Sequence, residues 1–269
     1  MMIDFNQDGF FLIAGPCVVE SRELIMEVGM ILKELTDELG IPFIFKSSYK
    51  KANRSRIDSF TGIGDQKALE ALGELRETLK VPVTTDVHSP EEAVMAAEYV
   101  DILQIPAFLC RQTELLQAAA GTGKVVNVKK GQFMSPAAMQ HVADKIVESG
   151  NEKVLLTERG VSFGYHELLV DMRSIPIMQD LGYPVVLDCT HANQQPNQPA
   201  GVTGGRPQYV DLLARSGIAA GVDGLFIETH PDPGKALSDG ANMLPLSEMQ
   251  NLLRVCKRIS EAIHPEESR

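Results

Sequence analysis

Short runs of β-branched and aliphatic residues recur along the chain, separated by stretches in which apolar residues return every three or four positions. Eight runs fit buried strands by length and composition. They are Phe10–Ala14, Pro42–Phe45, Val81–Thr85, Val100–Ile105, Lys124–Val128, Lys153–Thr157, Pro184–Leu187 and Gly224–Ile227. Because apolar strands that alternate with amphipathic helices form parallel βα units, these runs predict an α/β chain folded as a (β/α)8 TIM barrel.

The stretches between the runs carry helix signals. Ser21–Leu39 has apolar residues at helical spacing with Ser21 available as the N-cap, and Asp65–Leu79 repeats the pattern. A serine followed by proline marks two further helix starts, at Ser89 and at Ser135. The last helix is expected over Leu246–Ile263, where it completes the outer ring.

Size, charge and cysteine usage narrow the class of protein. A chain of 269 residues with 44% hydrophobic residues suits one barrel, so we expect a single catalytic domain over residues 1–269 with a short N-terminal extension. A net charge of −11 disfavours nucleic acid or an anionic membrane as partner. No apolar run approaches the ~20 residues of a membrane span. Four widely spaced cysteines, and an acidic N-terminus unlike a signal peptide, favour a cytoplasmic enzyme.

Three cations directly follow apolar strands. They are Lys46, Lys129 and Arg159, and an unpaired cation at such a position is costly. The C-terminal strand ends of a (β/α)8 barrel line its active site. A net-acidic protein that gathers cations there is expected to bind a small anion, such as a phosphate and carboxylate ester.

Two long segments interrupt the strand–helix rhythm. Tyr49–Gly64 and Ala192–Pro207 follow the second and seventh runs, and long loops on this face of a barrel are usually lids or binding loops. The remaining basic residues near the strand ends, Lys50, Arg56 and Lys130, are expected to form a solvated basic surface.

The runs that become neighbours when the barrel closes end in possible metal ligands. These candidates are Cys17, His191, Glu228 and Asp239. A thiolate, an imidazole and two carboxylates suit Zn²⁺, Fe²⁺ or Mn²⁺. Spacing alone is equally consistent with a site without metal. In that case Cys17 would be a buried thiol, Glu228 would pair with a lysine, and His191 would be a loop histidine. Spacing also leaves His230 and Cys189 as alternative ligands.

Other polar residues near the strand ends receive weaker interpretations. Asp86 fits an acceptor for a substrate hydroxyl or a proton carrier. His88 is interpreted as a cap of the following helix rather than as an acid or base. The string AGPC is not followed by a GxGxxG fingerprint, which disfavours a nicotinamide cofactor.

Long strings along the chain resemble one family, the 3-deoxy-D-manno-octulosonate 8-phosphate (KDO 8-phosphate) synthases. The strings are IAGPCVVES at 13–21, FKSSYKKANRS at 45–55, TTDVH at 84–88, DILQIPAFLCRQTELL at 101–116, NVKKGQF at 127–133, LTERGVSFGY at 156–165, VDMRSIPIM at 170–178, DCTH at 188–191 and GLFIETHPDPGKALSDG at 224–240. The resemblance covers nearly the whole chain.

The resemblance implies a function and a set of site residues. Such enzymes condense phosphoenolpyruvate with D-arabinose 5-phosphate and water, a step towards lipopolysaccharide, and they form homotetramers. The residues implied for phosphoenolpyruvate and the reacting atoms are Lys46, Lys51, Lys129, Arg159, Gln104 and Asp86. Those implied for the pentose phosphate are Asn53, Arg54, Ser55 and, from a neighbouring subunit, Arg111.

The resemblance also bears on the metal. The family has metal-dependent and metal-independent branches, and the second carries asparagine where this chain has Cys17, so one divalent metal ion per subunit is expected. The chain departs from the family pattern after the second strand, at Lys50, Arg56, Asp58 and Thr61. These departures affect the expected pentose-phosphate contacts rather than the reaction.

Two other functions compete with this interpretation. The related synthase that uses erythrose 4-phosphate shares an IAGPC start and a similar metal set. It typically carries a KPRTSP-like string where this chain has KANRS, which places it second. A barrel that only senses a phosphorylated metabolite would bind its ligand without releasing phosphate.

Overall fold

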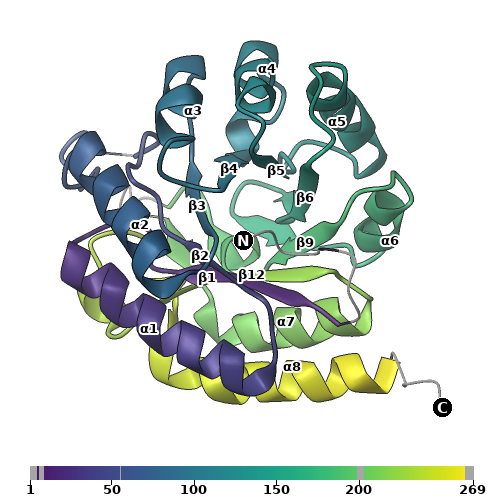
Figure 1. The fold of residues 1–269 in the computed structure, drawn as a ribbon. Coiled ribbons are helices and arrows are strands. Elements are labelled where there is room, and N and C mark those ends of the chain that lie inside the picture. The colour runs from purple at the N-terminus through teal and green to yellow at the C-terminus, as the bar shows by residue number, and fades with distance from the viewer. Residues whose placement is uncertain (1–4, 6–8, 55, 199–202, 264–269) are drawn as a thin grey trace.

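The computed structural model describes residues 5, 9–54, 56–198 and 203–263. In these residues the chain forms a closed barrel of eight parallel strands surrounded by helices, which confirms the predicted fold class (Figure 1). The barrel strands are β1 (Phe11–Gly15), β2 (Phe43–Lys46), β3 (Val83–Asp86), β4 (Ile102–Ile105), β5 (Val125–Lys129), β6 (Val154–Glu158), β9 (Val185–Asp188) and β12 (Gly224–His230).

The strands follow one another around the barrel in chain order, and β1 pairs with both β2 and β12, which closes the ring. A short strand, β13 (Leu244–Pro245), adds to β12. Most observed strands begin later than the apolar runs and end one residue further along. Strand β2, for example, ends at Lys46 and β12 continues to His230. Lys46, Asp86, Lys129 and Glu228, expected at or just beyond the strand ends, therefore belong to the strands themselves, whereas Cys17, Arg159 and His191 follow them.

The helices largely follow the predicted pattern. They are α1 (Arg22–Leu39), α2 (Asp65–Leu79), α3 (Pro90–Ala96), α4 (Thr113–Gly121), α5 (Gln140–Val147), α6 (Ser174–Gln179), α7 (Val210–Ala219) and α8 (Met249–Ile263). Ser21 caps α1 by accepting the Leu24 N–H at 3.1 Å, and Ser89 caps α3 by accepting the Glu92 N–H at 3.3 Å.

Two predicted helix starts were wrong. After β5 the chain first makes a 3-10 turn at Ala137–Met139 that has no side-chain cap, and α5 begins only at Gln140. A second 3-10 turn, Leu246–Glu248, precedes α8. A serine–proline or apolar signal marks where the chain turns, and the turn can tighten to 3-10 geometry before the α-helix starts.

Side chains inside the barrel form a lower apolar layer. This layer is separate from the larger core between strands and helices. Its buried members are Phe11, Ile13, Ile44, Ile102, Leu155, Val186 and Phe226. Because successive strand residues face opposite sides, the residue two positions further along each strand also faces inward.

Those next inward positions are polar. Ile44 is followed by Lys46, Ile102 by Gln104, Leu155 by Thr157, Val186 by Asp188 and Phe226 by Glu228, and all five polar residues are buried. We call them, together with Asp86, Asn127, Lys129 and Arg159, the upper polar layer. It lies at the carboxyl ends of the strands, above the apolar layer.

Gly15 allows β1 to approach β2 closely. Its φ is +156°, and a Cβ built on it would lie 2.1 Å from the Lys46 carbonyl oxygen. Any other residue would push the two strand ends apart. The glycine therefore keeps the chain at Cys17 close to the end of β2.

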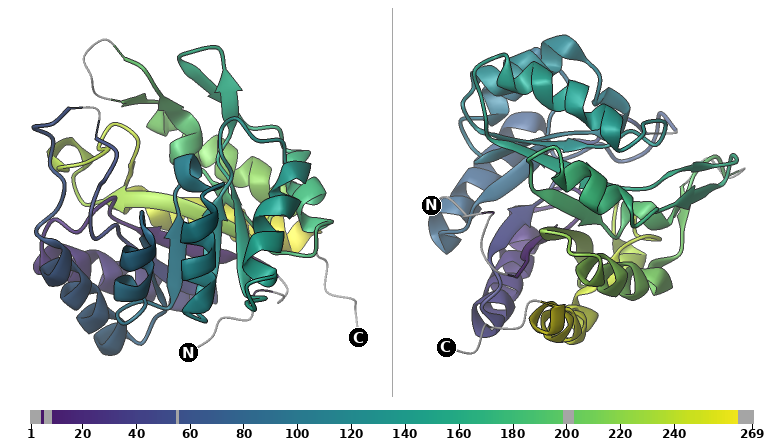
Figure 2. Two further views of the ribbon diagram at one scale, coloured as in Figure 1. Left: turned by 90° about the horizontal axis from the view of Figure 1, so that it is seen from above. Right: turned by 90° about the vertical axis from the view of Figure 1, so that its right-hand side faces the viewer.

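Two hairpins that the sequence did not predict extend from the same end of the barrel (Figure 2, left). One joins β7 (Val161–Phe163) to β8 (Glu167–Leu169), and the other joins β10 (Gln194–Gln195) to β11 (Gly204–Gly205). The second lies in the expected long loop, part of which, residues 199–202, lies outside the described chain. No described helix has the length and apolar character of a membrane span.

Candidate active site

A cavity of about 1010 Å³ opens at the carboxyl ends of the strands. Most side chains expected in the site line it: Lys46, Lys51, Asn53, Arg54, Asp86, Gln104, Lys129, Arg159, His191 and Asp239. Ser55 lies outside the described residues. Arg111 is exposed, just beyond the 3-10 turn Ala107–Leu109 whose residues line the cavity.

Lys46 is buried between two carboxylates. Its Nζ lies 2.6 Å from Glu228 Oε1 and 3.7 Å from Asp86 Oδ2, and it also donates to the Cys17 carbonyl at 3.2 Å. Burial alone would raise the pKa of Glu228, but Lys46 and His191 lower it to about 2. Asp86 behaves alike: burial raises its pKa, yet Lys46 and other lysines lower it well below the ordinary value. Both carboxylates are therefore charged at neutral pH.

Lys129 has a carboxylate partner that the sequence analysis missed. Its Nζ donates to Asp188 and lies 3.5 Å from the centroid of the Phe226 ring, a cation–π contact. Burial lowers the pKa of Lys129, and Asp188 partly offsets this effect. Asp188 is fully buried and could have been found from the strand period, because it follows inward-facing Val186 by two positions.

One terminal nitrogen of the Arg159 guanidinium donates hydrogen bonds to the protein, and the other donates none to the described residues. Its Nη2 donates to the His191 carbonyl at 3.2 Å and to Gln194 Oε1 at 2.6 Å. Its Nη1 is buried and has no hydrogen-bond partner among the described residues. A guanidinium is always charged, and a buried donor without a partner is costly. The free end of Arg159, in the cavity wall, is thus suited to an anionic ligand.

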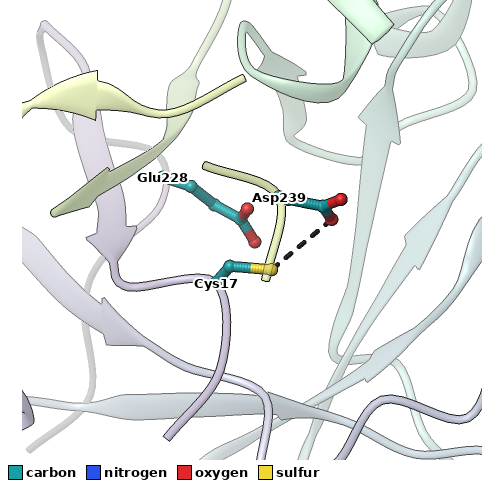
Figure 3. Close-up of side chains that lie close together, drawn as sticks. All are labelled: Cys17, Glu228 and Asp239. Atoms are coloured by element: carbon teal, nitrogen blue, oxygen red, sulfur yellow. Dashed lines mark hydrogen bonds between the residues drawn. The ribbon is translucent and has the colours of Figure 1, made fainter. Parts of the chain in front are cut away.

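Three candidate metal ligands, Cys17, Glu228 and Asp239, lie close together (Figure 3). The ligand atoms of Cys17, Glu228 and Asp239 all lie within 4.8 Å of one another, and Cys17 Sγ lies 3.5 Å from Asp239 Oδ2. Glu228 Oε2 is buried and has no hydrogen-bond partner among the described residues. Burial, with Glu228 adding to it, raises the pKa of the Cys17 thiol to about 12. A cation would satisfy the carboxylate oxygen and favour the thiolate, so the donor set fits a borderline divalent ion.

His191 stands at the edge of this group. Its Nδ1 lies 2.9 Å from Asp188 Oδ2, and its Nε2 lies 3.5 Å from Glu228 Oε2. A carboxylate that binds one ring nitrogen orients the other towards a metal. The alternative ligands are not in the converging group: His230 Nδ1 accepts the Asp232 N–H, and Cys189 packs in the outer core.

Lys51 lies near the same acidic groups. Burial would lower its pKa, but Cys17, Glu228 and further acidic groups raise it above the ordinary value. Arg54 approaches from the same loop, since its Nη1 donates to Ser238 Oγ at 2.8 Å and its Nη2 lies 4.0 Å from Asp239 Oδ2. The loop after β2 thus brings two further cations to the candidate metal ligands.

Three interpretations of charged residues need correction. Lys130 is not solvated: it is fully buried, and its Nζ lies 3.3 Å from Glu158 Oε1. Lys50 is partly buried and bonds Glu92 and Asp65, whereas Arg56 is exposed as expected.

His88 does not cap α3, since Ser89 does. The His88 ring instead lines the cavity, with Nδ1 2.8 Å from Glu92 Oε2.

Comparisons with known proteins agree on one family. A profile of the DAHP synthetase I family matches residues 3–264. A 2-dehydro-3-deoxyphosphooctonate aldolase of Brucella anthropi is 55% identical over 248 residues, which cover 92% of this chain and 90% of that protein. Proteins of the same name from Brucella ovis and Brucella canis are each 56% identical with the same coverage.

Lys130→Met should lower the free energy of unfolding by about 3–5 kcal/mol, because it leaves Glu158 as a buried charge without its partner. Urea denaturation followed by circular dichroism measures the change. The control is Arg56→Met, which removes an exposed cation paired with Asp58 and should leave the free energy of unfolding nearly unchanged. Equal effects of the two substitutions would contradict the structural role of Lys130.

Proposed function

The chain belongs to the DAHP synthetase I family, and from this membership we propose that it condenses phosphoenolpyruvate with D-arabinose 5-phosphate and water. The products are 3-deoxy-D-manno-octulosonate 8-phosphate, a precursor of lipopolysaccharide, and inorganic phosphate. Identity of 55% to a 2-dehydro-3-deoxyphosphooctonate aldolase over 92% of the chain supports this choice of reaction. The structural observation that carries it is the buried, unpartnered Nη1 of Arg159 in the wall of a cavity shared with Lys46 and Lys129.

We assign phosphoenolpyruvate to the cationic wall. Lys129 ends β5 and Arg159 directly follows the adjacent strand β6. With Lys46 and Lys51 they present four positive groups to the phosphate and the carboxylate. Arg159 can bind an anionic group with the free side of its guanidinium, while the lysines act as adjustable point charges. In this assignment Gln104 and Asp86, which also line the cavity, lie near the reacting carbon atoms.

The pentose phosphate is assigned to the loop after β2. Asn53 and Arg54 line the cavity there, and Ser55 follows them in sequence. Arg111 is exposed outside this cavity, so its proposed contact with the same phosphate would come from a neighbouring subunit of a homotetramer. Both substrates are small and anionic, which suits a cytoplasmic enzyme without nucleic-acid or membrane partners.

The chemistry joins C3 of phosphoenolpyruvate to the aldehyde carbon while water adds at C2, and the C2–O bond to phosphate then breaks. Positive charge develops at C2 and negative charge on the aldehyde oxygen. The cations offset the mutual repulsion of the two substrates and hold C3 close to the aldehyde, which is the kind of positioning that lowers a barrier by several kcal/mol. The ionised carboxylates of Glu228 and Asp86 would stabilise the charge at C2.

We propose that Cys17, His191, Glu228 and Asp239 hold one divalent ion per subunit, Zn²⁺, Fe²⁺ or Mn²⁺. The bound ion would supply a Lewis-acidic charge for the aldehyde oxygen or for the attacking water. Asp188 would hold the His191 ring in place through Nδ1. Lys46, which bonds Glu228 Oε1, would leave Oε2 for the ion.

Phosphate release should be rapid with phosphoenolpyruvate and D-arabinose 5-phosphate and at least tenfold slower with erythrose 4-phosphate at equal concentration. The pair of sugars separates the proposed reaction from that of the alternative synthase, which prefers the four-carbon acceptor. A sensor protein would release no phosphate with either sugar. Preference for erythrose 4-phosphate would overturn the assignment.

Removal of divalent ions by a chelator should abolish turnover, and readdition of Zn²⁺, Fe²⁺ or Mn²⁺ should restore it. Elemental analysis should find about one ion per subunit in the purified protein and less than a tenth of that in Cys17→Ala. Full activity of the stripped protein would refute the metal site.

Cys17→Asn should retain more activity than Cys17→Ala, because its amide oxygen can still occupy the site.

Arg111→Ala should raise the KM for D-arabinose 5-phosphate by about tenfold or more and change that for phosphoenolpyruvate little, since it removes a cation from one substrate's phosphate only. Steady-state kinetics with each substrate varied in turn measures the split. Arg173→Ala, which removes an exposed arginine outside the cavity, is the control. An equal rise in the KM for both substrates would contradict the role assigned to Arg111.

A further inference from the structure

A chain of hydrogen bonds crosses four neighbouring strands inside the barrel. The Thr157 hydroxyl donates to Asn127 Oδ1 at 2.7 Å, and Asn127 Nδ2 donates to Gln104 Oε1 at 3.2 Å. Gln104 Nε2 in turn donates to Asp86 Oδ1 at 2.6 Å. We call these four side chains the interior hydrogen-bond chain. It begins on β6 and ends on β3, at a carboxylate that lines the cavity.

Strand register brings these side chains together. Asp86 pairs with Gln104 across β3 and β4, and Gln104 pairs with Asn127 across β4 and β5. Thr157 is two positions beyond Leu155, the partner of Asn127 on β6. All four residues are buried, and Asn127 and Thr157 are fully so. Neither Asn127 nor Thr157 is among the residues that line the cavity.

The carboxylate fixes the direction of every bond in the chain. An ionised Asp86 only accepts hydrogen bonds, so Gln104 must turn its NH₂ towards it. The oxygen of Gln104 then faces Asn127, so Asn127 must donate a hydrogen bond to it from its own NH₂. The oxygen of Asn127 in turn requires the hydroxyl of Thr157 as donor. Each amide therefore has one orientation, and the last donor decides whether the whole chain is satisfied.

We propose that Asn127 and Thr157 are positioning residues for the reaction, because they lock the Gln104 amide and through it the Asp86 carboxylate beside Lys46. This inference rests on the proposed function, which assigns Gln104 and Asp86 to the reacting centre. Asp86 has a second hydrogen bond from Ser48, on its other oxygen. Without Thr157, the orientation that Asp86 imposes on both amides leaves the buried Asn127 oxygen without a donor, so rotated orientations of the amides compete with it. Gln104 would then hold Asp86 only part of the time.

Thr157→Val tests the proposal, since it replaces only the hydroxyl by a methyl group of similar size. It should lower kcat by about tenfold and leave the KM for both substrates within twofold. Thr157→Ser keeps the donor and should restore kcat to within twofold of the wild type. Asn127→Leu combined with Thr157→Val should be no slower than Asn127→Leu alone, because either change breaks the same chain.

Thr84→Val is the matched control. Thr84 is also a fully buried strand threonine, but its hydroxyl has no hydrogen-bond partner among the described residues. Its replacement should leave kcat within twofold of the wild type. Equal loss of kcat in Thr84→Val and Thr157→Val, unchanged kcat in Thr157→Val, or failure of Thr157→Ser to restore kcat would each overturn the positioning role.

A structural readout separates this inference from the proposed function. If the wild-type protein does not consume D-arabinose 5-phosphate, the proposed function fails. A crystal structure of Thr157→Val then tests the hydrogen-bond chain by itself. We expect the Gln104 amide to turn or to occupy two orientations. A Gln104–Asp86 contact unchanged from that in the wild-type crystal structure would overturn the inference.

Discussion

Pairing of buried opposite charges is the constraint on which the upper polar layer depends. Charged groups in a protein interior are costly unless a partner of opposite sign compensates them. Lys46 with Glu228 and Lys129 with Asp188 meet this requirement, and they link β2 to β12 and β5 to β9 across the barrel. The compensation is incomplete in two places, at Arg159 Nη1 and at Glu228 Oε2. One free donor and one free acceptor thus remain, the first suited to an anion and the second to a cation.

The position of this layer follows from the period of a strand. Inside the barrel an apolar side chain is followed two residues later by a polar one. The lower apolar layer therefore lies directly beneath the upper polar layer, whose charged side chains line the cavity. The strand pattern and the polar residues at or after the ends of the runs were enough to predict the barrel and several residues that line the cavity, namely Lys46, Asp86, Lys129, Arg159, His191 and Asp239. Lys51, Asn53, Arg54 and Gln104, which also line it, were implied only by the family resemblance. Asp188 was missed, although the same period places it inward beside Val186.

Other features do not follow from local sequence. Lys129 ends β5 and lines the cavity, whereas its neighbour Lys130 is buried against Glu158 and the Met134 carbonyl. The expected solvation of Lys130 failed for that reason, since burial there is set by tertiary packing. Cys17 and Asp239 are 222 residues apart, so their 3.5 Å contact depends on barrel closure and on Gly15, which lets β1 approach β2. The two hairpins depend on pairing between strands of only two or three residues, which are too short for the apolar pattern to indicate.

A crystal structure of the protein with phosphoenolpyruvate and Mn²⁺, with anomalous scattering used to locate the ion, tests most directly whether this cavity is the reaction centre. The phosphate or carboxylate of phosphoenolpyruvate should contact Arg159 Nη1 and Lys129 Nζ. The anomalous peak should lie among Cys17, Glu228 and Asp239. A ligand bound elsewhere, with Arg159 Nη1 still without a partner, would contradict the account.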